Sequence, residues 1–257
     1  MSEIHPTAVI HPGATLAGDC VVGPYCVIGG HVTLGEGNRL HSHVVLDGHT
    51  EIGTGNEFFP FASIGLKTQD LKWKGGTTWT RIGNNNTFRE NVTVHSATGD
   101  GEATVMGSDN HILAYSHIAH NVLLGDHVIL SNNGTLAGHV IVEDHAIVGG
   151  LSAVHQFCRL GKMSILGGCT KVVSDVAPFM MVDGNPARTR AVNKVGLERN
   201  GVAVEAQEAL RRAHRLLFRK GLTTGNALGA IRTEVPQLDE VKHLVSFVET
   251  SDRGITR

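Results

Sequence analysis

Aliphatic residues recur at every sixth position along most of this chain. The series runs from Ile4 to Ile64 without a polar residue, and it resumes from Ile82 to Val94 and from Met106 to Val172. This period matches neither an amphipathic helix, with about 3.6 residues per turn, nor an isolated strand, with two. It is typical of a parallel β-helix, in which each repeat forms one side of a coil. The repeat therefore predicts a mainly β fold for most of the chain.

The repeat also predicts which residues lie next to each other in space. Three six-residue repeats close one triangular coil, so a coil contains eighteen residues. Aliphatic side chains fill the interior, and glycines supply turn geometries that other residues resist. Successive coils stack about 4.8 Å apart, as neighbouring strands do. Residues i and i+18 should therefore lie one above the other.

Two polar segments interrupt the repeat, at about residues 66–81 and 96–105. Intact repeats flank both segments, so we expect each to loop out of the coil stack. Loops on a rigid scaffold often carry function. The first segment is the stronger candidate, because it contains Gln69, Asp70, Lys72 and two tryptophans.

A helical pattern replaces the repeat from about residue 190. One predicted helix ends at Gly221, a suitable C-cap residue, and a second follows it. Their apolar faces consist of Ala209, Leu210, Ala213, Leu216 and Leu217 in the first helix and Leu238, Val241, Leu244, Val245 and Val248 in the second. We therefore divide the chain into a β-helix over residues 1–187, which includes both looped-out segments, and an α-helical domain over residues 188–257.

Charge and cysteine content limit the possible partners and compartments. The net charge is −2, but residues 188–257 contain thirteen Lys and Arg against eight Asp and Glu, a net charge of +5. Such a domain could attract an acidic protein or a phosphorylated ligand, but it is too weakly basic to indicate nucleic acid. With no long apolar run and no basic segment before one, we expect no membrane span and no export signal. Four cysteines without CxxC spacing predict buried thiols in a reducing cytoplasm.

The six-residue repeat resembles that of the hexapeptide acyltransferase superfamily over residues 4–177. Members of that superfamily form left-handed β-helices and usually assemble as trimers with active sites between subunits. The resemblance implies a left-handed parallel β-helix, followed by a small helical domain, in a homotrimer. Some members are anhydrases or plain scaffolds, so the repeat alone does not specify the chemistry.

Six histidines lie between His117 and Phe157 and raise the question of a metal site. His117 and His120 have the spacing of metal ligands on a helix, but residues three apart in a β segment should point to opposite sides. Anhydrase-type relatives use two histidines five residues apart within one coil, and this chain has Val122 and Val140 where such a ligand would stand. We therefore expect no metal.

The eighteen-residue offset pairs His120 with Gly138. The backbone N–H of Gly138 should lie one coil above the imidazole, roughly 5 Å away. Acyl transfer needs such a pair, because a base removes the proton of the acceptor and an N–H stabilises the oxyanion of the tetrahedral intermediate. His139 and His155 should line the same groove. Four other histidines share the repeat position of His139 and are interpreted as structural corner residues: His31, His49, His127 and His145.

Several motifs together resemble one acyltransferase family: QDLKW, ENVTVH, HIAH, NNGTLAGHV, GGLSAVHQF, GGCTKVV and DRGITR. They are similar to the acyl-carrier-protein–UDP-N-acetylglucosamine O-acyltransferases, which begin lipid A synthesis by moving a 3-hydroxyacyl chain to the sugar. The resemblance implies that His120 is the general base and Gly138 the oxyanion donor. It implies contacts with substrate or carrier protein for Asp70, Lys72, His117, His139, His155, Gln156 and Arg199. It implies acyl carrier protein and UDP-N-acetylglucosamine as partners, and no cofactor, because the thioester is already activated.

Asn121 departs from the pattern of that family, whose better-known members have aspartate after the catalytic histidine. An aspartate orients the ring and stabilises the imidazolium, whereas asparagine supplies no charge. Either the base is weaker, then, or another carboxylate contributes. A related N-acyltransferase carries IAHNV at this place, as this chain does, although its N-terminal uridine-binding domain has no counterpart before Ile4. The alternative hypotheses are N-acyltransfer to a 3-amino analogue of the sugar nucleotide, a related UDP-acylglucosamine N-acyltransferase, and a non-catalytic β-helical scaffold or sugar-nucleotide binder.

Overall fold

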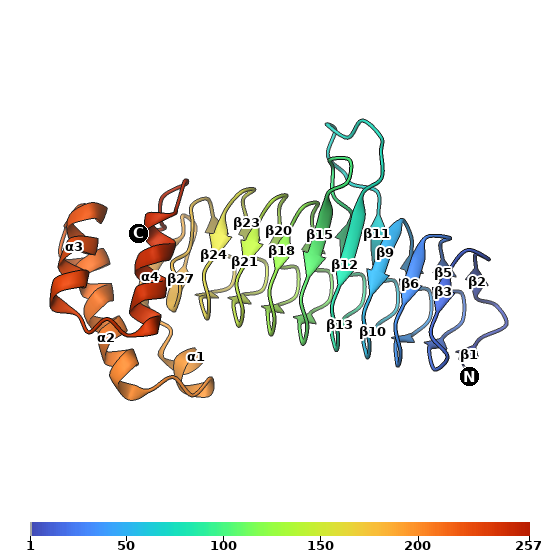
Figure 1. Ribbon diagram of the computed structural model, residues 1–257, viewed down its shortest axis with the longest axis horizontal. Coiled ribbons are helices and arrows are strands. Elements are labelled where there is room, and N and C mark those ends of the chain that lie inside the picture. Colours follow the sequence, from blue (N-terminus) through green and yellow to red (C-terminus); the bar gives the residue numbers. More distant parts are fainter. Residues whose placement is uncertain (1) are drawn as a thin grey trace.

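Short strands wind around a three-sided prism in the computed structural model, which describes residues 2–257 (Figure 1). Almost all of the strands pair in parallel, and a helical domain closes one end of the prism. The predicted left-handed parallel β-helix with a helical C-terminal part is confirmed.

Each side of the prism is one sheet. The first sheet contains β1 (Glu3–Ile4), β4 (Val21–Val22), β7 (Arg39–Leu40), β10 (Glu57–Phe58), β13 (Thr87–Phe88), β16 (His111–Ile112), β19 (Ile129–Leu130), β22 (Ile147–Val148), β25 (Ile165–Leu166), β27 (Met180–Asp183) and β28 (Arg188–Val192). The second contains β2 (Val9–Ile10), β5 (Val27–Ile28), β8 (Val45–Leu46), β11 (Ser63–Leu66), β14 (Thr93–His95), β17 (His117–Ile118), β20 (Thr135–Leu136), β23 (Ala153–Val154) and β26 (Lys171–Val172). The third contains β3 (Thr15–Leu16), β6 (Val32–Leu34), β9 (His49–Ile52), β12 (Trp79–Ile82), β15 (Ala103–Met106), β18 (Leu123–Leu124), β21 (Ile141–Val142) and β24 (Arg159–Leu160).

Strand pairing follows the predicted offset of eighteen residues. Ile4 pairs with Val22 in the first sheet, and Ile118 pairs with Leu136 in the second. Where the polar segments intervene, the offset lengthens, and Ile52 pairs with Ile82. The coils on either side of an excursion nevertheless stay in contact, because the excursion leaves and rejoins the stack at one corner.

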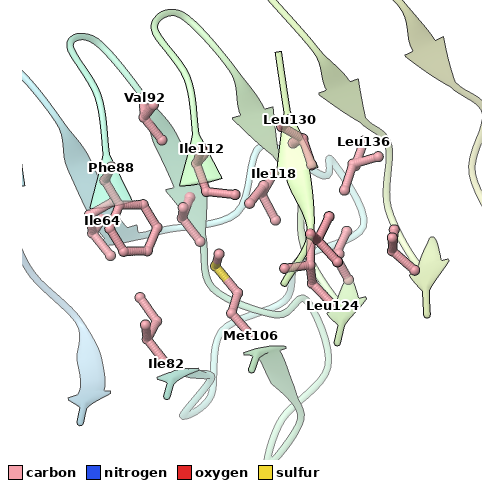
Figure 2. Close-up of a cluster of buried hydrophobic side chains, with 14 of the residues drawn as sticks. Ile64, Ile82, Phe88, Val92, Met106, Ile112, Ile118, Leu124, Leu130 and Leu136 are labelled. Atoms are coloured by element: carbon pink, nitrogen blue, oxygen red, sulfur yellow. The ribbon is translucent and has the colours of Figure 1, made fainter. Parts of the chain in front are cut away.

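The interior of the prism is a continuous column of aliphatic side chains. Almost every aliphatic residue of the repeat from Val22 onward is buried, and Figure 2 shows the middle of this column. Phe58 and Phe88 stack with their ring centroids 4.9 Å apart and their planes nearly parallel. A second column along one interior edge is polar: buried Asn38, Asn56, Asn86 and Asn110 are linked by hydrogen bonds from coil to coil.

The corners of the prism depend on a residue in the left-handed backbone region. Among residues 2–257, all seventeen non-glycine residues with positive φ lie three positions after an interior hydrophobic residue, which is Phe58 or Phe88 in two cases. Asn121 (φ 59°) and His139 (φ 59°) are two of them. Asparagine, aspartate and histidine tolerate this conformation better than most residues. The corner interpretation thus holds for His127 and His145, whereas His31 and His49 do not have positive φ.

Glycines have two roles in the repeat. Gly37, Gly48 and Gly55 have positive φ, as their predicted role in turns requires, whereas a second group serves a different purpose. They directly follow the aliphatic residue, where a Cβ atom would approach the next coil: at Gly53 it would lie 2.7 Å from the Gly83 carbonyl oxygen, and at Gly83 2.7 Å from that of Gly107. The expectation that they supply turn geometry was wrong at these positions. Close approach of neighbouring coils excludes a side chain there.

Both polar excursions leave the prism at the corner between the second and third sheets. Residues 67–78 connect β11 to β12, and residues 96–102 connect β14 to β15. These connections are shorter than the expected segments 66–81 and 96–105, because Leu66, Trp79–Ile82 and Ala103–Met106 continue the sheets. The excursions stand together above the prism in Figure 1. A hydrogen bond of 3.0 Å between the hydroxyls of Thr68 and Thr98 joins them.

The helical domain consists of α1 (Lys194–Arg199), α2 (Val204–His214), which continues as a π-helical turn (Arg215–Arg219), α3 (Thr224–Glu234) and α4 (Asp239–Glu249). The predicted apolar faces of α2 and α4 form its core, together with residues of α1 and α3 that the sequence pattern did not reveal. Gly221 has a φ of 67°, as its predicted role at the helix end requires.

Two expectations from the sequence concern the cellular compartment of the protein. Among residues 2–257, none of the helices is long and apolar enough to cross a membrane. Cys20, Cys26 and Cys158 are buried free thiols, as predicted, whereas Cys169 is a free thiol that is exposed.

Candidate active site

His120 lies on the corner from which both excursions leave the prism. It follows β17, and the next strand, β18, belongs to the third sheet. Gly138 and Gln156 occupy the same repeat position in the next two coils, after β20 and β23. His120, Gly138 and Gln156 therefore form one column along the corner, with the excursion 96–102 one coil before His120.

The backbone N–H at this repeat position takes no part in the sheet ladder. Pro6, Pro12, Pro24 and Pro60 occupy the position elsewhere in the chain, which is possible because no N–H is needed there. The Gly138 N–H likewise has no hydrogen-bond acceptor among residues 2–257, although Gly138 is buried. Buried N–H groups are nearly always paired, so this donor is available for a ligand.

The His120 imidazole fills the space that a side chain at Gly138 would need. A Cβ atom built on Gly138 would overlap the imidazole atoms Cε1 and Nε2. The predicted neighbourhood of His120 and Gly138 is therefore present in the structure. Only glycine at position 138 leaves room for the ring to lie against the backbone of the next coil.

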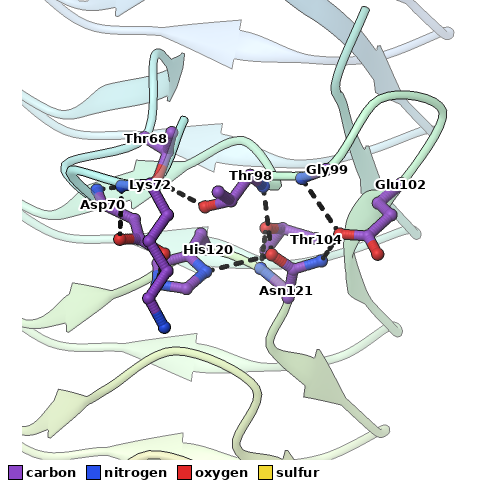
Figure 3. Close-up of polar contacts among 9 residues, drawn as sticks. All are labelled: Thr68, Asp70, Lys72, Thr98, Gly99, Glu102, Thr104, His120 and Asn121. Carbon is purple, nitrogen blue, oxygen red and sulfur yellow. Dashed lines mark hydrogen bonds and ion pairs between the residues drawn. The ribbon is translucent and has the colours of Figure 1, made fainter. Parts of the chain in front are cut away.

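Asn121 holds the His120 ring from the other side (Figure 3). Its Oδ1 lies 3.0 Å from His120 Nδ1 and also accepts a hydrogen bond from the Thr98 backbone N–H, at 3.0 Å. Since Oδ1 can only accept, Nδ1 must carry the proton of the neutral ring. This leaves Nε2 unprotonated and able to accept a proton. The Asn121 Nδ2 donates to Glu102 Oε2 at 2.7 Å.

The first excursion places a carboxylate beside the free nitrogen of His120. Asp70 Oδ2 lies 3.8 Å from His120 Nε2, and its Oδ1 accepts a hydrogen bond from the Lys72 backbone N–H at 3.0 Å. Both side chains are largely shielded, with 14% of His120 and 22% of Asp70 exposed. The side chain of Lys72 itself is exposed. The Asp70 carboxylate thus lies next to Nε2, the ring nitrogen that does not contact Asn121.

His139 and Phe157 continue the site along the prism. The His139 ring meets the His120 ring edge to face, with centroids 5.2 Å apart, and stacks on Phe157 at 4.8 Å. Burial, then the neighbouring His120, lowers the pKa of His139. The ring is therefore neutral near pH 7. His155 and Gln156 are exposed one coil further along, where the His155 Nδ1 lies 3.1 Å from the Gln156 carbonyl oxygen.

His117 is packed into the wall of the site in its neutral form. Its Nδ1 lies 2.7 Å from the Thr93 hydroxyl, and its ring meets that of His95 edge to face at 5.0 Å. Burial, together with the nearby His95 and His120, lowers the pKa of His117 to about 4. His117 can therefore donate or accept a hydrogen bond toward a ligand without carrying a charge at neutral pH.

The expectation that His117 and His120 point to opposite sides was wrong. The chain turns at the corner after Ile118 instead of continuing extended, so both rings face outward and are close enough to repel each other when charged. The described part of the chain, residues 2–257, contains no group of three or more His, Cys, Asp or Glu side chains arranged to hold a metal ion.

Arg199 is the one predicted site residue that the fold of a single chain separates from the others. It is exposed at the end of α1, in the helical domain. In the same domain, a cavity of about 630 Å³ opens between β28, α1 and α2, and its charged lining residues are Glu208 and four basic residues: Lys194, Arg211, Arg212 and Arg215.

Three groups at the site were not predicted from the sequence: His95, Thr98 and Glu102. His95 closes the repeat just before the second excursion, and Thr98 and Glu102 lie on that excursion. The available signal was position, because the excursion replaces the corner turn one coil before His120. Its polar residues had to lie near the imidazole.

Comparisons with known proteins identify relatives of the whole chain. Residues 1–36 match a family model described as bacterial transferase hexapeptide, and residues 175–256 match one described as UDP N-acetylglucosamine O-acyltransferase, domain 2. The acyl-[acyl-carrier-protein]–UDP-N-acetylglucosamine O-acyltransferase of Pseudomonas syringae pv. syringae (strain B728a) is 46% identical over 203 residues, which are 79% of each chain.

Solved structures agree over almost the full length. LpxA from Acinetobacter baumannii superposes with a TM-score of 0.95 at 45% identity, and 99% of each chain is covered. LpxA from Bacteroides fragilis, a UDP-N-acetylglucosamine acyltransferase, gives a TM-score of 0.96 at 36% identity and covers 99% of this chain and 100% of that one.

The contact between Gly138 and His120 predicts that Gly138→Ala displaces the imidazole. The new methyl group would overlap the ring, so we expect a different His120 rotamer and loss of the hydrogen bond to Asn121. Gly150→Ala is the matched control, because Gly150 has the same repeat position and its nearest neighbour to a Cβ atom, the Asn132 carbonyl oxygen, is 3.4 Å away. Crystal structures of both variants measure the effect, and an unmoved ring in Gly138→Ala would contradict it.

The lowered pKa of His117 predicts a loss of stability at acidic pH. Below about 6.5 the unfolded chain protonates this imidazole, whereas the folded chain does so only near a pKa of about 4. At neutral pH the ring is uncharged in both the folded and the unfolded chain, so its protonation does not affect stability. As the pH falls from about 6.5 to about 4, the unfolded chain binds the proton first, and the folded chain is destabilised. In urea unfolding, His117→Asn should reduce this fall by roughly 1–2 kcal/mol, allowing for partial solvent screening. His5→Asn, at an exposed histidine, is the control, and equal pH dependence in both variants would refute the assignment.

Proposed function

The chain belongs to the acyl-[acyl-carrier-protein]–UDP-N-acetylglucosamine O-acyltransferase family, and we propose that it transfers a 3-hydroxyacyl chain from acyl carrier protein to the 3-hydroxyl of UDP-N-acetylglucosamine, the first step of lipid A synthesis. One observation carries the proposal for this chain. An imidazole with a free Nε2 lies directly against a buried glycine whose N–H is unpaired within residues 2–257. Base and oxyanion donor are the two groups that acyl transfer needs.

His120 acts as the general base in the proposed reaction. Its Nε2 takes the proton of the sugar 3-hydroxyl as the oxygen attacks the thioester carbonyl carbon. The carbonyl oxygen then carries the negative charge of the tetrahedral intermediate, and the Gly138 N–H donates a hydrogen bond to it. When the intermediate collapses, the C–S bond breaks and the imidazolium returns its proton to the leaving thiolate. The thioester is already activated, so the reaction needs no covalent enzyme intermediate, no metal and no cofactor.

Several groups around His120 are proposed to bind the substrates. Asp70 lies beside Nε2 at 3.8 Å, where its carboxylate can accept a hydrogen bond from a sugar hydroxyl. Neutral His117 and His139 supply donors without a charge, and the exposed Lys72 ammonium can meet the diphosphate. His155 and Gln156, one coil further along, are exposed, and we propose that they contact the acyl chain or the carrier arm.

Acyl carrier proteins are acidic, and the basic residues of the helical domain suit such a partner. Lys194, Arg211, Arg212 and Arg215 gather around one cavity in this domain, and Arg199 lies on the same α1 helix as Lys194. Opposite charges steer association and orient the partner. We therefore propose that the carrier protein docks on the helical domain and that Arg199 contacts the substrate or the carrier. Free thiols and an acyl carrier partner fit a cytoplasmic enzyme.

An exposed apolar row supports the proposed homotrimer with active sites between subunits. Tyr25, Phe61, Tyr115 and Leu151 are all exposed, and all four lie on the corner between the first and second sheets. Such a row is costly in water and suits contact with another copy of the chain. The second sheet, which carries His117, would then face the neighbouring subunit. Sedimentation equilibrium should give the mass of three chains, and a monomer would refute the assembly.

Replacing His120 with alanine tests the assigned base. With UDP-N-acetylglucosamine and 3-hydroxyacyl carrier protein, we expect His120→Ala to lose about 10²–10⁴-fold in kcat, because the imidazole is the general base of the proposed reaction. Circular dichroism and the measured assembly should be unchanged, since the ring is not part of the interior column. Unchanged turnover would show that another residue is the base.

The same assay distinguishes the acceptors. Wild-type enzyme is compared with UDP-N-acetylglucosamine and its 3-amino analogue, each with acyl donors of several lengths. A strong preference for the hydroxyl sugar would refute the hypothesis of an amine acceptor, which the asparagine at position 121 suggested. Absence of transfer to either sugar would favour a non-catalytic binder.

A further inference from the structure

We propose that Glu102 is a positioning residue for His120 and supplies, through the side chain of Asn121, the negative charge that the neighbouring asparagine lacks. The inference rests on the proposed function, in which His120 becomes an imidazolium during transfer. Three groups form a continuous line: His120 Nδ1 lies 3.0 Å from Asn121 Oδ1, and Asn121 Nδ2 donates to Glu102 Oε2 at 2.7 Å (Figure 3). Glu102 comes from the second excursion, which otherwise has no part in the proposed reaction.

The orientation of the Asn121 amide follows from its neighbours. Its oxygen faces the Thr98 backbone N–H at 3.0 Å, and an N–H can only donate. Its nitrogen faces the Glu102 carboxylate, which can only accept when ionised. Rotating the amide by half a turn would place donor against donor and acceptor against acceptor. The amide therefore links a proton on His120 to a charge on Glu102.

The position of Glu102 is itself fixed. Its Oε2 also accepts the Gly99 backbone N–H at 3.0 Å, which closes a turn within the excursion. Its backbone carbonyl accepts the Trp79 N–H at 2.9 Å, which ties it to β12. The Asn121 backbone is tied down as well, because its N–H donates to the buried Thr104 hydroxyl at 2.9 Å.

The other charged and titratable groups near His120 do not fill this role. Asp70 faces Nε2, the side on which the acceptor hydroxyl must bind, so its carboxylate acts on the substrate side of the ring and does not hold Nδ1. Burial and neighbouring histidines lower the pKa of His95, His117 and His139, so these rings are neutral and supply no negative charge. The Lys72 ammonium is positive. On the Nδ1 side of the ring, Glu102 is the carboxylate that the described hydrogen bonds connect to His120, through Asn121.

Glu102→Gln removes the negative charge of the carboxylate and keeps its hydrogen bonds. One amide oxygen can accept from both Gly99 and Asn121, as Oε2 does now, so the excursion keeps its contacts. Because Glu102 is exposed, water screens its charge, and we expect kcat to fall roughly three- to tenfold while KM changes by less than about twofold. The acidic limb of the pH profile of kcat should also move to lower pH, because the imidazolium loses a stabilising charge.

Moving the charge one residue closer should restore activity. In the double variant Glu102→Gln with Asn121→Asp, the new carboxylate contacts His120 Nδ1 directly and the new amide can donate to it. We expect kcat to return to within about threefold of wild type. A purely structural role for Glu102 would give no such rescue. Asp100→Asn is the control, because Asp100 lies on the same excursion but its Oδ1 accepts from the Thr77 N–H at 2.7 Å, away from His120.

A measurement without substrate separates this proposal from the proposed function. Nitrogen chemical shifts of ¹⁵N-histidine-labelled protein, assigned with His120→Ala, report the protonation of Nδ1. We expect the Nδ1–H form in wild type and a titration at lower pH in Glu102→Gln. An unchanged titration, or an unchanged kcat and pH profile, would overturn the role of Glu102. Absence of turnover in wild type would instead refute the proposed function, with the titration still testing the relay.

Discussion

Packing of each interior aliphatic side chain on its counterpart in the next coil holds this structure in register. Strands of two or a few residues are too short to pair stably alone, and parallel pairing of eighteen-residue coils supports them only because the interior column is continuous. The same register places His120 against Gly138, so the geometry of the site is a consequence of the core. A shift of the interior column by one six-residue repeat would separate His120 from the Gly138 N–H.

The repeat makes the oxyanion donor common and the base rare. The position of Gly138 recurs in each six-residue repeat, and the ladder does not use its N–H, so proline occupies it at Pro12 and Pro24 and side chains accept from it at Thr54 and Asp126. Gly138 differs from these positions in that an imidazole lies in place of its missing side chain. Glycine thus has two roles in the fold: at Gly53 it permits close approach of coils, and at Gly138 it permits close approach of a catalytic ring.

The sequence predicted those features that depend on the period and missed those that depend on side-chain contacts. The period was sufficient for the β-helix, for the offset of eighteen and for the pair His120 and Gly138. It could not show that His117 and His120 face the same side, because that depends on the turn after Ile118. Nor could it reveal the polar column around Asn56, since buried asparagines are stable only when each finds partners in the coils above and below. Glu102 was missed because an excursion has no period from which to infer a neighbour.

A convex prism explains why the excursions are needed at all. Side chains on the outside of a β-helix diverge, so one corner alone cannot surround a reacting group or shield it from water. His120 becomes enclosed because residues 67–78 carry Asp70 over it and residues 96–102 carry Thr98 and Glu102 beside it. Both segments replace a turn at the same corner, where insertion leaves the interior column intact. The repeat therefore supplies the base and the oxyanion donor. The two excursions that interrupt the repeat supply the groups that orient the base and the carboxylates near it.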